Sequence, residues 1–429
     1  MTNYGTISFY LSKNHPDYKV AEKHAIEARR LYNTLNKLKN EETEHYYDNT
    51  KQTPVHNSLN ITIKDNLETK RKAIKQAQNI NLPEKVSQNI RDKVRDTWNS
   101  FYKRRSKKLI TGTPKYKNKY SEVPYNNQTL MRKQSLPHII KPTGWSKGFT
   151  LPENISRSMI KNALLIPRPD GFELKVLYNK KNNLIGFNEE PVIKQTKTPV
   201  YASIDFGIDK LSTIITTDGQ RPKTVNGKNL KSLNRYFNKE NGKISSKIGT
   251  AKGVEKESLI KQKQRLWFKR EKQINHYLQS ASNEIVRYLA NSGVQEVVIG
   301  WSEGFKHNVN MGKKNNQNFV QLPLARFRDL LVAKLNNIGV RTVIQEESYT
   351  SKASFLDNDV IPVFDKDKTT KHKFSGYRVS RGVYKSKLTG QRIHADVNGA
   401  WNILSKNKGK QSIGLCSRIV VFPENLLIR

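Results

Sequence analysis

The chain has little cysteine, few acidic residues and no long hydrophobic run, and each shortage excludes a class of protein. Cys416 is the only cysteine among the 429 residues, which excludes a disulfide framework and a thiolate zinc site. No apolar run approaches the length of a transmembrane helix, and the opening residues lack the features of a signal peptide. We therefore expect a cytoplasmic protein that has no membrane partner.

The shortage of acidic residues leaves a large positive charge. The chain has 77 lysines and arginines against 37 aspartates and glutamates, so its formal net charge is +40. A solvated surface needs no such excess of one sign, and a polyanionic partner accounts for it. Because the basic residues recur along the whole chain rather than in one tail, nucleic acid is the polyanion that fits best.

The first half of the chain contains a strand pattern, two helical patterns and then several short β-like runs. Residues 5–12 alternate as a strand does, while residues 19–40 and 83–109 have helical periodicity. Turn residues separate the β-like runs within residues 112–178. Because a strand precedes the helices, we expect them to be an insertion into one β domain, which would be a small barrel or sandwich.

Basic residues accompany both helical patterns. The second helix ends in a basic run with Tyr102 beside it, a combination that suits phosphate contacts and stacking on a nucleic-acid strand. A solvated amphipathic helix explains any single one of these residues equally well. The candidate nucleic-acid contacts here are Arg29, Arg30, Lys103, Arg104, Arg105, Lys107 and Lys108.

The second half has an α/β order. Two β-rich runs form a hairpin pattern after residue 199, and a basic, asparagine-rich connection follows over residues 226–253. A long helix, a strand, a helix, a strand and a final helix come next. We therefore expect a multidomain α+β protein whose second half has an RNase H-like fold.

Acidic residues stand at the ends of apolar runs in this half. Asp205 ends the buried run 200–204, and Glu346 and Glu347 end a later one. Asp396 stands at the start of the last helical pattern. Burial of a lone carboxylate is costly without a hydrogen-bond donor, a cation or a metal ion. A turn aspartate satisfied by backbone amides remains the alternative for Asp205, and helix capping remains the alternative for Asp396.

In an RNase H-like fold these acids would converge at one end of the sheet. Carboxylates that converge repel one another unless divalent cations neutralise them. Two such cations could activate a water molecule and stabilise the leaving oxygen of a phosphodiester. The sequence therefore predicts two Mg²⁺ ions held by Asp205 and Asp396 together with Glu346 or Glu347.

Four stretches of the second half together resemble one known family. They are residues 203–209, 312–321, 346–357 and 395–402, which read SIDFGID, GKKNNQNFVQ, EESYTSKASFLD and ADVNGAWN. On these residues the chain resembles the TnpB family of transposon-encoded, RNA-guided DNA endonucleases. Their RuvC-like nuclease domain is similar to that of type V CRISPR effectors. The resemblance covers roughly residues 201–403 and is weaker in the first half.

The resemblance implies particular partners. They are a guide RNA transcribed from the transposon end and a double-stranded DNA target beside a short motif, cut at the RuvC site after R-loop formation. A bacterial, nucleoid-associated setting is implied as well. Further candidate nucleic-acid contacts in the matching stretches and the basic region after them are Lys313, Lys314, Asn315, Asn316, Gln317, Lys352 and Arg378.

The resemblance also implies a division into domains. A wedge-type β-barrel domain comprises residues 1–12 and 110–190, and a helical recognition insertion comprises residues 13–109. The RuvC-like nuclease domain comprises residues 199–348 and 391–429, and a ribbon-like target-strand-loading insertion comprises residues 349–390.

One departure from the family concerns the catalytic glutamate. Most members carry it at the end of the strand that here reads Ile299-Gly300. Because neighbouring strand ends lie about 5 Å apart, Glu346 or Glu347 at the end of the next strand could reach the same cation. Glu303 is the alternative third acid if its loop folds back, and a surface role for both later glutamates stays open.

The other departure concerns zinc. Many relatives place two Cys-x-x-Cys pairs in the ribbon-like region, and residues 349–390 contain no cysteine, so we expect no zinc there. Either a small metal-free core or a disordered basic loop could take its place.

The sequence thus predicts a Mg²⁺-dependent, RNA-guided DNA endonuclease. Because the usual glutamate is missing, a nuclease-dead, RNA-guided DNA-binding repressor is the first alternative. A nuclease of RNase H-like fold that uses no guide is the second, since charge and acids alone fit it equally well.

Overall fold

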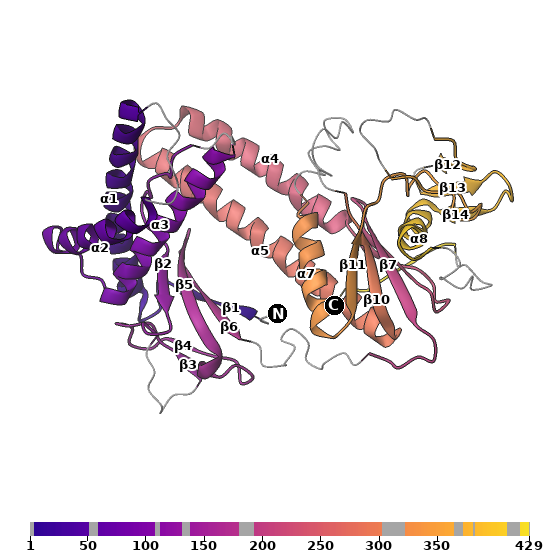
Figure 1. Ribbon diagram of the computed structural model, residues 1–429, viewed down its shortest axis with the longest axis horizontal. Helices are drawn as coiled ribbons and strands as arrows, with labels where there is room; N and C mark the ends of the chain where they lie inside the picture. The colour runs from indigo at the N-terminus through magenta and orange to yellow at the C-terminus, as the bar shows by residue number, and fades with distance from the viewer. Residues whose placement is uncertain are drawn as a thin grey trace. The chain divides into compact units, whose positions relative to one another are not determined.

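The computed structural model describes residues 4–50, 59–107, 112–130, 138–179, 193–302, 322–363, 372–380, 382–409 and 421–428, with backbone only for 42–50 and 59–66. The chain forms two compact units, Met1–Asn183 and Leu184–Arg429 (Figure 1). Within the described ranges, none of the helices has both the length and the apolar character needed to cross a membrane.

The first unit is built on an antiparallel sheet. Its strands are β1 (Tyr4–Ser12), β2 (Val123–Asn126), β5 (Ile160–Arg168) and β6 (Gly171–Asn179), and β3 (Ile139–Ile140) pairs separately with β4 (Phe149–Thr150). The order in the sheet is β1-β6-β5-β2, and β1 pairs with β6 along its whole length. The intervening helices therefore lie, in sequence, between strands of one sheet. Closure of this sheet into a barrel stays a prediction.

The helices of this unit are α1 (Tyr18–Thr50), α2 (Leu59–Ala77), α3 (Glu84–Ser106) and the short 3-10 helix η1 (Arg157–Met159). The apolar faces that the sequence predicts are buried, among them Leu31 and Leu35 of α1 and Val94 and Trp98 of α3. Trp98 also donates a hydrogen bond from Nε1 to Asn36 Oδ1 at 2.9 Å. Apolar packing and a buried polar contact thus join α1 to α3.

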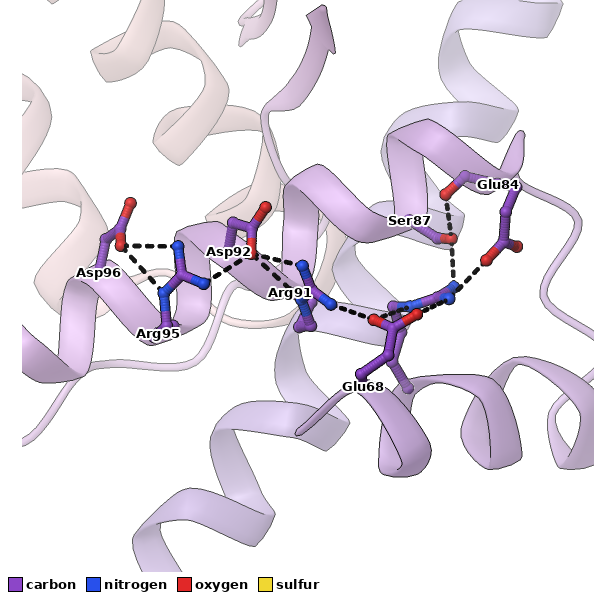
Figure 2. A network of polar contacts seen from close by, with 8 residues as sticks. Glu68, Glu84, Ser87, Arg91, Asp92, Arg95 and Asp96 are labelled. Atoms are coloured by element: carbon purple, nitrogen blue, oxygen red, sulfur yellow. Dashed lines mark hydrogen bonds and ion pairs between the residues drawn. The ribbon is translucent and has the colours of Figure 1, made fainter. Parts of the chain in front are cut away.

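A network of ion pairs and hydrogen bonds joins α2 to α3 (Figure 2). Besides Arg71, it comprises Glu68, Glu84, Ser87, Arg91, Asp92, Arg95 and Asp96. The guanidinium of the fully buried Arg71 donates to Glu68 at 2.6 and 3.0 Å, to Ser87 Oγ at 2.7 Å and to Glu84. Hydrogen bonding by Arg71 lowers the pKa of Glu84 from 4.5 to about 2. The contribution of Glu84 to stability is therefore present above pH 4.5 and declines as the pH falls toward 2.

Replacing Arg71 with methionine should destabilise the first unit. Charged hydrogen bonds would be lost, but Glu68 and Glu84 would each keep another cation, Arg91 and Lys75. We therefore expect a loss of about 1 to 3 kcal/mol in the free energy of unfolding, measurable by chemical denaturation.

Arg95→Met is the matched control, because Arg95 belongs to the same network of ion pairs but its side chain is 29% exposed, whereas that of Arg71 is fully buried. Its effect should stay below about 0.5 kcal/mol. Equal losses for the two variants would contradict the central role of Arg71.

The second unit is built on a mixed six-stranded sheet. Its strands are β7 (Val200–Phe206), β8 (Lys210–Thr216), β9 (Lys223–Asn226), β10 (Val294–Gly300), β11 (Arg341–Gln345) and β15 (Glu424–Asn425). Their order is β11-β10-β7-β8-β9-β15. β7 is antiparallel to β8 and parallel to β10, and β10 is parallel to β11. The carboxyl ends of β7, β10 and β11 therefore lie side by side.

Helices cover both faces of this sheet. They are α4 (Lys228–Thr250), α5 (Gly253–Asn291), α7 (Leu324–Asn337) and α8 (Ala395–Lys408). Val297 and Ile299 of β10 enter the core shared with α5 and α7, whereas Val298 enters the core shared with α8. Figure 1 accordingly shows α7 and α8 on opposite sides of the sheet.

The expectation of a connection over residues 226–253 is wrong, because α4 occupies most of them. The buried Leu230, Phe237 and Ile244 recur every seven residues, and α4 packs against α5. Nearly all the other positions of α4 are polar, so its apolar face is narrow.

In the ribbon-like region, β12 (Gly376–Ser380) and β13 (Val383–Ser386) form an antiparallel sheet with β14 (Arg392–His394), which lies just beyond the predicted boundary at residue 390. The buried Tyr384 donates from its hydroxyl to Lys352 O at 2.7 Å. Asp359 accepts hydrogen bonds from the backbone and hydroxyl of Ser375 at 3.0 and 2.6 Å. The described residues of this region therefore form a small ordered unit rather than a disordered loop.

Candidate active site

Asp205 lies near the carboxyl end of β7, inside the sheet. The preceding residue, Ile204, is opposite Ile299 of β10, and Asp205 itself is opposite Thr213 of β8. Ile204 and Ile299 are both fully buried. The apolar run that ends at Asp205 thus carries its carboxyl group to the rim of the core.

Glu347 follows β11 by two residues and reaches toward β10. Gly300, the last residue of β10, pairs in register with Gln345 of β11. A Cβ atom added to Gly300 would lie 3.0 Å from Glu347 Oε2 and 2.5 Å from Ile403 Cδ1. A side chain at position 300 would therefore meet Ile403 first and the carboxyl group of Glu347 beside it.

Helix α8 brings the third acid. Its N-cap is His394, whose Nδ1 accepts a hydrogen bond from the Asp396 amide at 3.3 Å. Asp396 lies in the first helical turn and is not the cap, so capping does not account for its side chain. One turn further on, a Cβ atom added to Gly399 would lie 2.8 Å from Asp205 Oδ2. The close approach of β7 to α8 therefore depends on glycine at this position.

Glu347 and Asp396 act electrostatically on Asp205. Burial raises the pKa of Asp205 well above its ordinary value of 3.8. The negative charges of Glu347 and Asp396 raise this pKa further, and Arg378 opposes them. The charged form of Asp205 is thus destabilised until something positive lies beside it.

The two adjacent glutamates differ. Burial raises the pKa of Glu347 from 4.5 to about 7, with the charge of Glu346 adding to the effect. Burial would also raise the pKa of Glu346, but hydrogen bonds from Lys406 Nζ at 2.5 Å and from Ser348 N at 2.6 Å outweigh it and lower the pKa. Glu346 is therefore a charged partner of Lys406, while Glu347 acts on Asp205.

The donor chemistry of Asp205, Glu347 and Asp396 fits a divalent cation, because carboxylate oxygens are the ligands that Mg²⁺ takes. Among the described residues, however, no three histidine, cysteine, aspartate or glutamate side chains lie close enough together to form a metal-binding group. Cation binding would therefore require these carboxylates to draw closer together.

The basic residues singled out in the first unit fall into two sets. The guanidinium of Arg29 donates to Asn118 O at 2.8 Å, and that of Arg30 donates to Glu27 and to Gln78 O. Both arginines therefore have partners within their own unit. The remaining described ones are exposed at or just beyond the end of α3, and they are Lys103, Arg104, Arg105 and Lys107.

In the second unit, Lys352 and Arg378 line one pocket of about 400 Å³ together with Phe374, Tyr377 and Tyr384. Because Arg378 also influences the pKa of Asp205, this pocket lies near the acids. The predicted residues that fall outside the described part of the chain are Lys108, Glu303, Lys313, Lys314, Asn315, Asn316 and Gln317.

Residues of α8 that the sequence analysis missed hold the segment after β11. Asn398 bonds Phe355 N and Ala353 O at 3.0 and 2.8 Å, and Asn402 donates to Ala353 O at 2.7 Å. The spacing of four residues between the two asparagines was the available signal, because it places both on one face of a helix.

Comparisons with known proteins agree with this picture. The OrfB_IS605 family model, described as a probable transposase, matches residues 184–303. A TnpB-like protein, ORF457 of Acidianus two-tailed virus, is 23% identical over 223 residues, which are 51% of this chain and 44% of that relative. Over these residues the chain is similar to the TnpB family. It matches less than half the length of this curated relative.

The chain also matches solved structures. A cryo-EM structure of a Cas12f1–sgRNA–target DNA complex has a TM-score of 0.50 at 14% identity and covers 90% of this chain and 82% of that one. A CRISPR-Cas12f ternary complex, also at 14% identity, covers 90% and 80% with a TM-score of 0.38. The first likeness supports a multidomain α+β fold of nuclease type.

Replacing Gly399 with alanine should disturb the acids without destabilising α8. Alanine favours a helix interior over glycine by about 1 kcal/mol, but the added Cβ would force the carboxyl group of Asp205 to move. We expect an unchanged or higher Tm and, under the function proposed in the next subsection, DNA cleavage lower by about tenfold or more.

Gly242→Ala is the matched control. Gly242 also lies within a helix, α4, and nothing lies within 4 Å of an added Cβ there. It should show the gain in Tm and no loss of cleavage. A fall in cleavage of the same size in both variants would contradict the close approach of α8 to Asp205.

Proposed function

We propose that this protein is a transposon-encoded, RNA-guided DNA endonuclease of the TnpB family, which hydrolyses phosphodiesters at a two-Mg²⁺ site of RuvC type. One observation carries the proposal. Asp205, Glu347 and Asp396 come from β7, the loop after β11 and the first turn of α8, and the charges of the latter two both act on the partly buried Asp205. The net charge of +40 supports a polyanionic substrate.

The roles of the acids follow from their surroundings. Asp205, Glu347 and Asp396 would hold the cations, which when bound would activate water and stabilise the leaving oxygen. Burial of Asp205 keeps its carboxyl group poorly hydrated, so a cation gains more from binding there than in water. Glu346 stays with Lys406 and serves to orient the segment that carries Glu347.

The partners are proposed from charge and likeness together. The solved Cas12f1 complex contains sgRNA and target DNA, which supports a guide RNA and a DNA target for this chain. Lys352 and Arg378, beside the acids, would hold phosphates of the strand to be cut. Base pairing with the guide would choose the sequence, while exposed basic residues such as Lys103 and Arg104 would hold backbones.

Changing the acids one at a time tests the assignment. Mutation of a residue that only supports a metal ligand lowers activity by up to roughly 100-fold. Asp205→Ala and Glu347→Gln remove a proposed ligand itself, so each should lower cleavage of a matched plasmid by more than that. Glu346→Gln should cost less, because Glu346 is bonded to Lys406 and Ser348. Target binding, followed by gel shift, should persist in all three.

Glu303→Gln completes the set. It should cut at the wild-type rate, and if it alone is inactive, the assignment of Glu347 is wrong.

Two further results separate this function from its rivals. The protein purified with its co-expressed RNA should cut a matched plasmid with Mg²⁺ and stop cutting after chelation or RNase treatment. RNA-guided binding without any cutting would favour a repressor. The reason to consider a repressor is that position 300 is glycine, where most family members have the catalytic glutamate. Sequence-specific cutting that survives RNase treatment would favour a nuclease without a guide.

A further inference from the structure

Lys406 makes an unusually complete set of contacts near the end of α8. Its side chain is only 6% exposed. Its Nζ donates to Glu346 Oε2 at 2.5 Å, to Pro362 O at 3.0 Å and to Ser348 O at 3.1 Å. A lysine ammonium has three N–H groups, so each has its own acceptor. Such a fully bonded buried charge is fixed in direction as well as in position.

The three acceptors of Lys406 mark the two ends of one segment, residues 346–362. Two of them, Glu346 and Ser348, are the residues immediately before and after Glu347. The middle of the segment is held separately, since Asn398 and Asn402 bond the backbone of residues 350–355. Lys406 is therefore the α8 residue in contact with the backbone and side chain that flank Glu347.

We infer that Lys406 is a positioning residue, which holds the residues around Glu347 so that the Glu347 carboxyl group lies over Gly300 and faces Asp205. The effect on cleavage rests on the proposed function, but the positioning itself does not. Glu347 stands after the end of β11, so no strand hydrogen bonds fix its direction. Its carbonyl oxygen accepts hydrogen bonds from Thr350 N and Oγ1 at 3.3 and 2.8 Å, and the contacts of Lys406 add a constraint on the residues before and after it.

Lys408 offers a matched comparison on the same helix. Its Nζ bonds Glu296 Oε1 at 2.6 Å and lies 4.7 Å from the ring centre of Tyr201. Lys408 thus also joins α8 to the sheet through a buried carboxylate, but it contacts β7 and β10 rather than the segment of Glu347. Glu296 also pairs with Arg341, so it keeps a cation when Lys408 is lost.

The test compares Lys406→Met, Lys406→Arg and Lys408→Met by hydrogen–deuterium exchange of the full chain. In Lys406→Met, exchange should rise about tenfold or more in residues 346–350 and change little in residues 353–355, which Asn398 still holds. Lys406→Arg should restore part of the protection, and Lys408→Met should leave residues 346–350 as in the wild type.

A second readout is Mn²⁺ binding followed by electron paramagnetic resonance. Lys406→Met should bind Mn²⁺ about tenfold more weakly, whereas Lys408→Met should bind as the wild type does. Cleavage should then need a correspondingly higher Mg²⁺ concentration in Lys406→Met, with the maximal rate less affected.

The outcomes separate this inference from the proposed function. Unchanged exchange in residues 346–350 of Lys406→Met, or an equal rise in Lys408→Met, overturns the positioning role. If Lys406→Met does not fold, Glu346→Gln removes the charge of one acceptor, and unchanged exchange around Glu347 in that variant overturns it too. A wild-type protein that binds no Mn²⁺ and cuts no DNA refutes the proposed function, while the exchange pattern still decides the role of Lys406.

Discussion

Repulsion between carboxylates in a poorly hydrated place is the constraint on which the rest of the second unit depends. Asp205 is partly buried, and its pKa is raised by desolvation and by the charges of Glu347 and Asp396. Acids are costly in such a place unless a cation compensates them. The nearby cations belong to the protein itself, since Arg378 acts on Asp205 and Lys406 acts on Glu347. The structure thus keeps the acids near one another at a cost that bound metal ions would remove.

Two glycines make this approach sterically possible. Gly399 leaves room on α8 for the carboxyl group of Asp205, and Gly300 leaves room at the end of β10 for that of Glu347. A side chain at either position would compete for the space that a carboxyl group fills. The glycine at the end of β10 and the glutamate after β11 are therefore parts of one packing arrangement. A carboxyl group that reaches over from the segment after β11 needs position 300 to have no side chain.

Much of this fold and part of the site could be predicted from the sequence. The strand at 200–206 and its terminal aspartate stand out because apolar runs and charge breaks are local signals. Helix α4 was missed because only one residue in seven, such as Phe237, faces its partner. The choice between Glu346 and Glu347 could not be made, because both follow the strand, where alternation no longer applies. Their directions depend on Lys406, 60 residues away from Glu346 in sequence.

That dependence has a physical reason. A side chain on β10 would be held by the hydrogen bonds to β7 and β11 on either side, so its direction would follow from the register of the sheet. A side chain in the loop after β11 has no such support, and ordering a loop costs conformational entropy for every residue fixed. Polar side chains of α8 offset this cost, as Asn402 and Lys406 do for the loop. When the glutamate stands in the loop after β11 rather than on β10, its direction is therefore fixed by side chains of α8 and not by the sheet. The same helix carries Asp396.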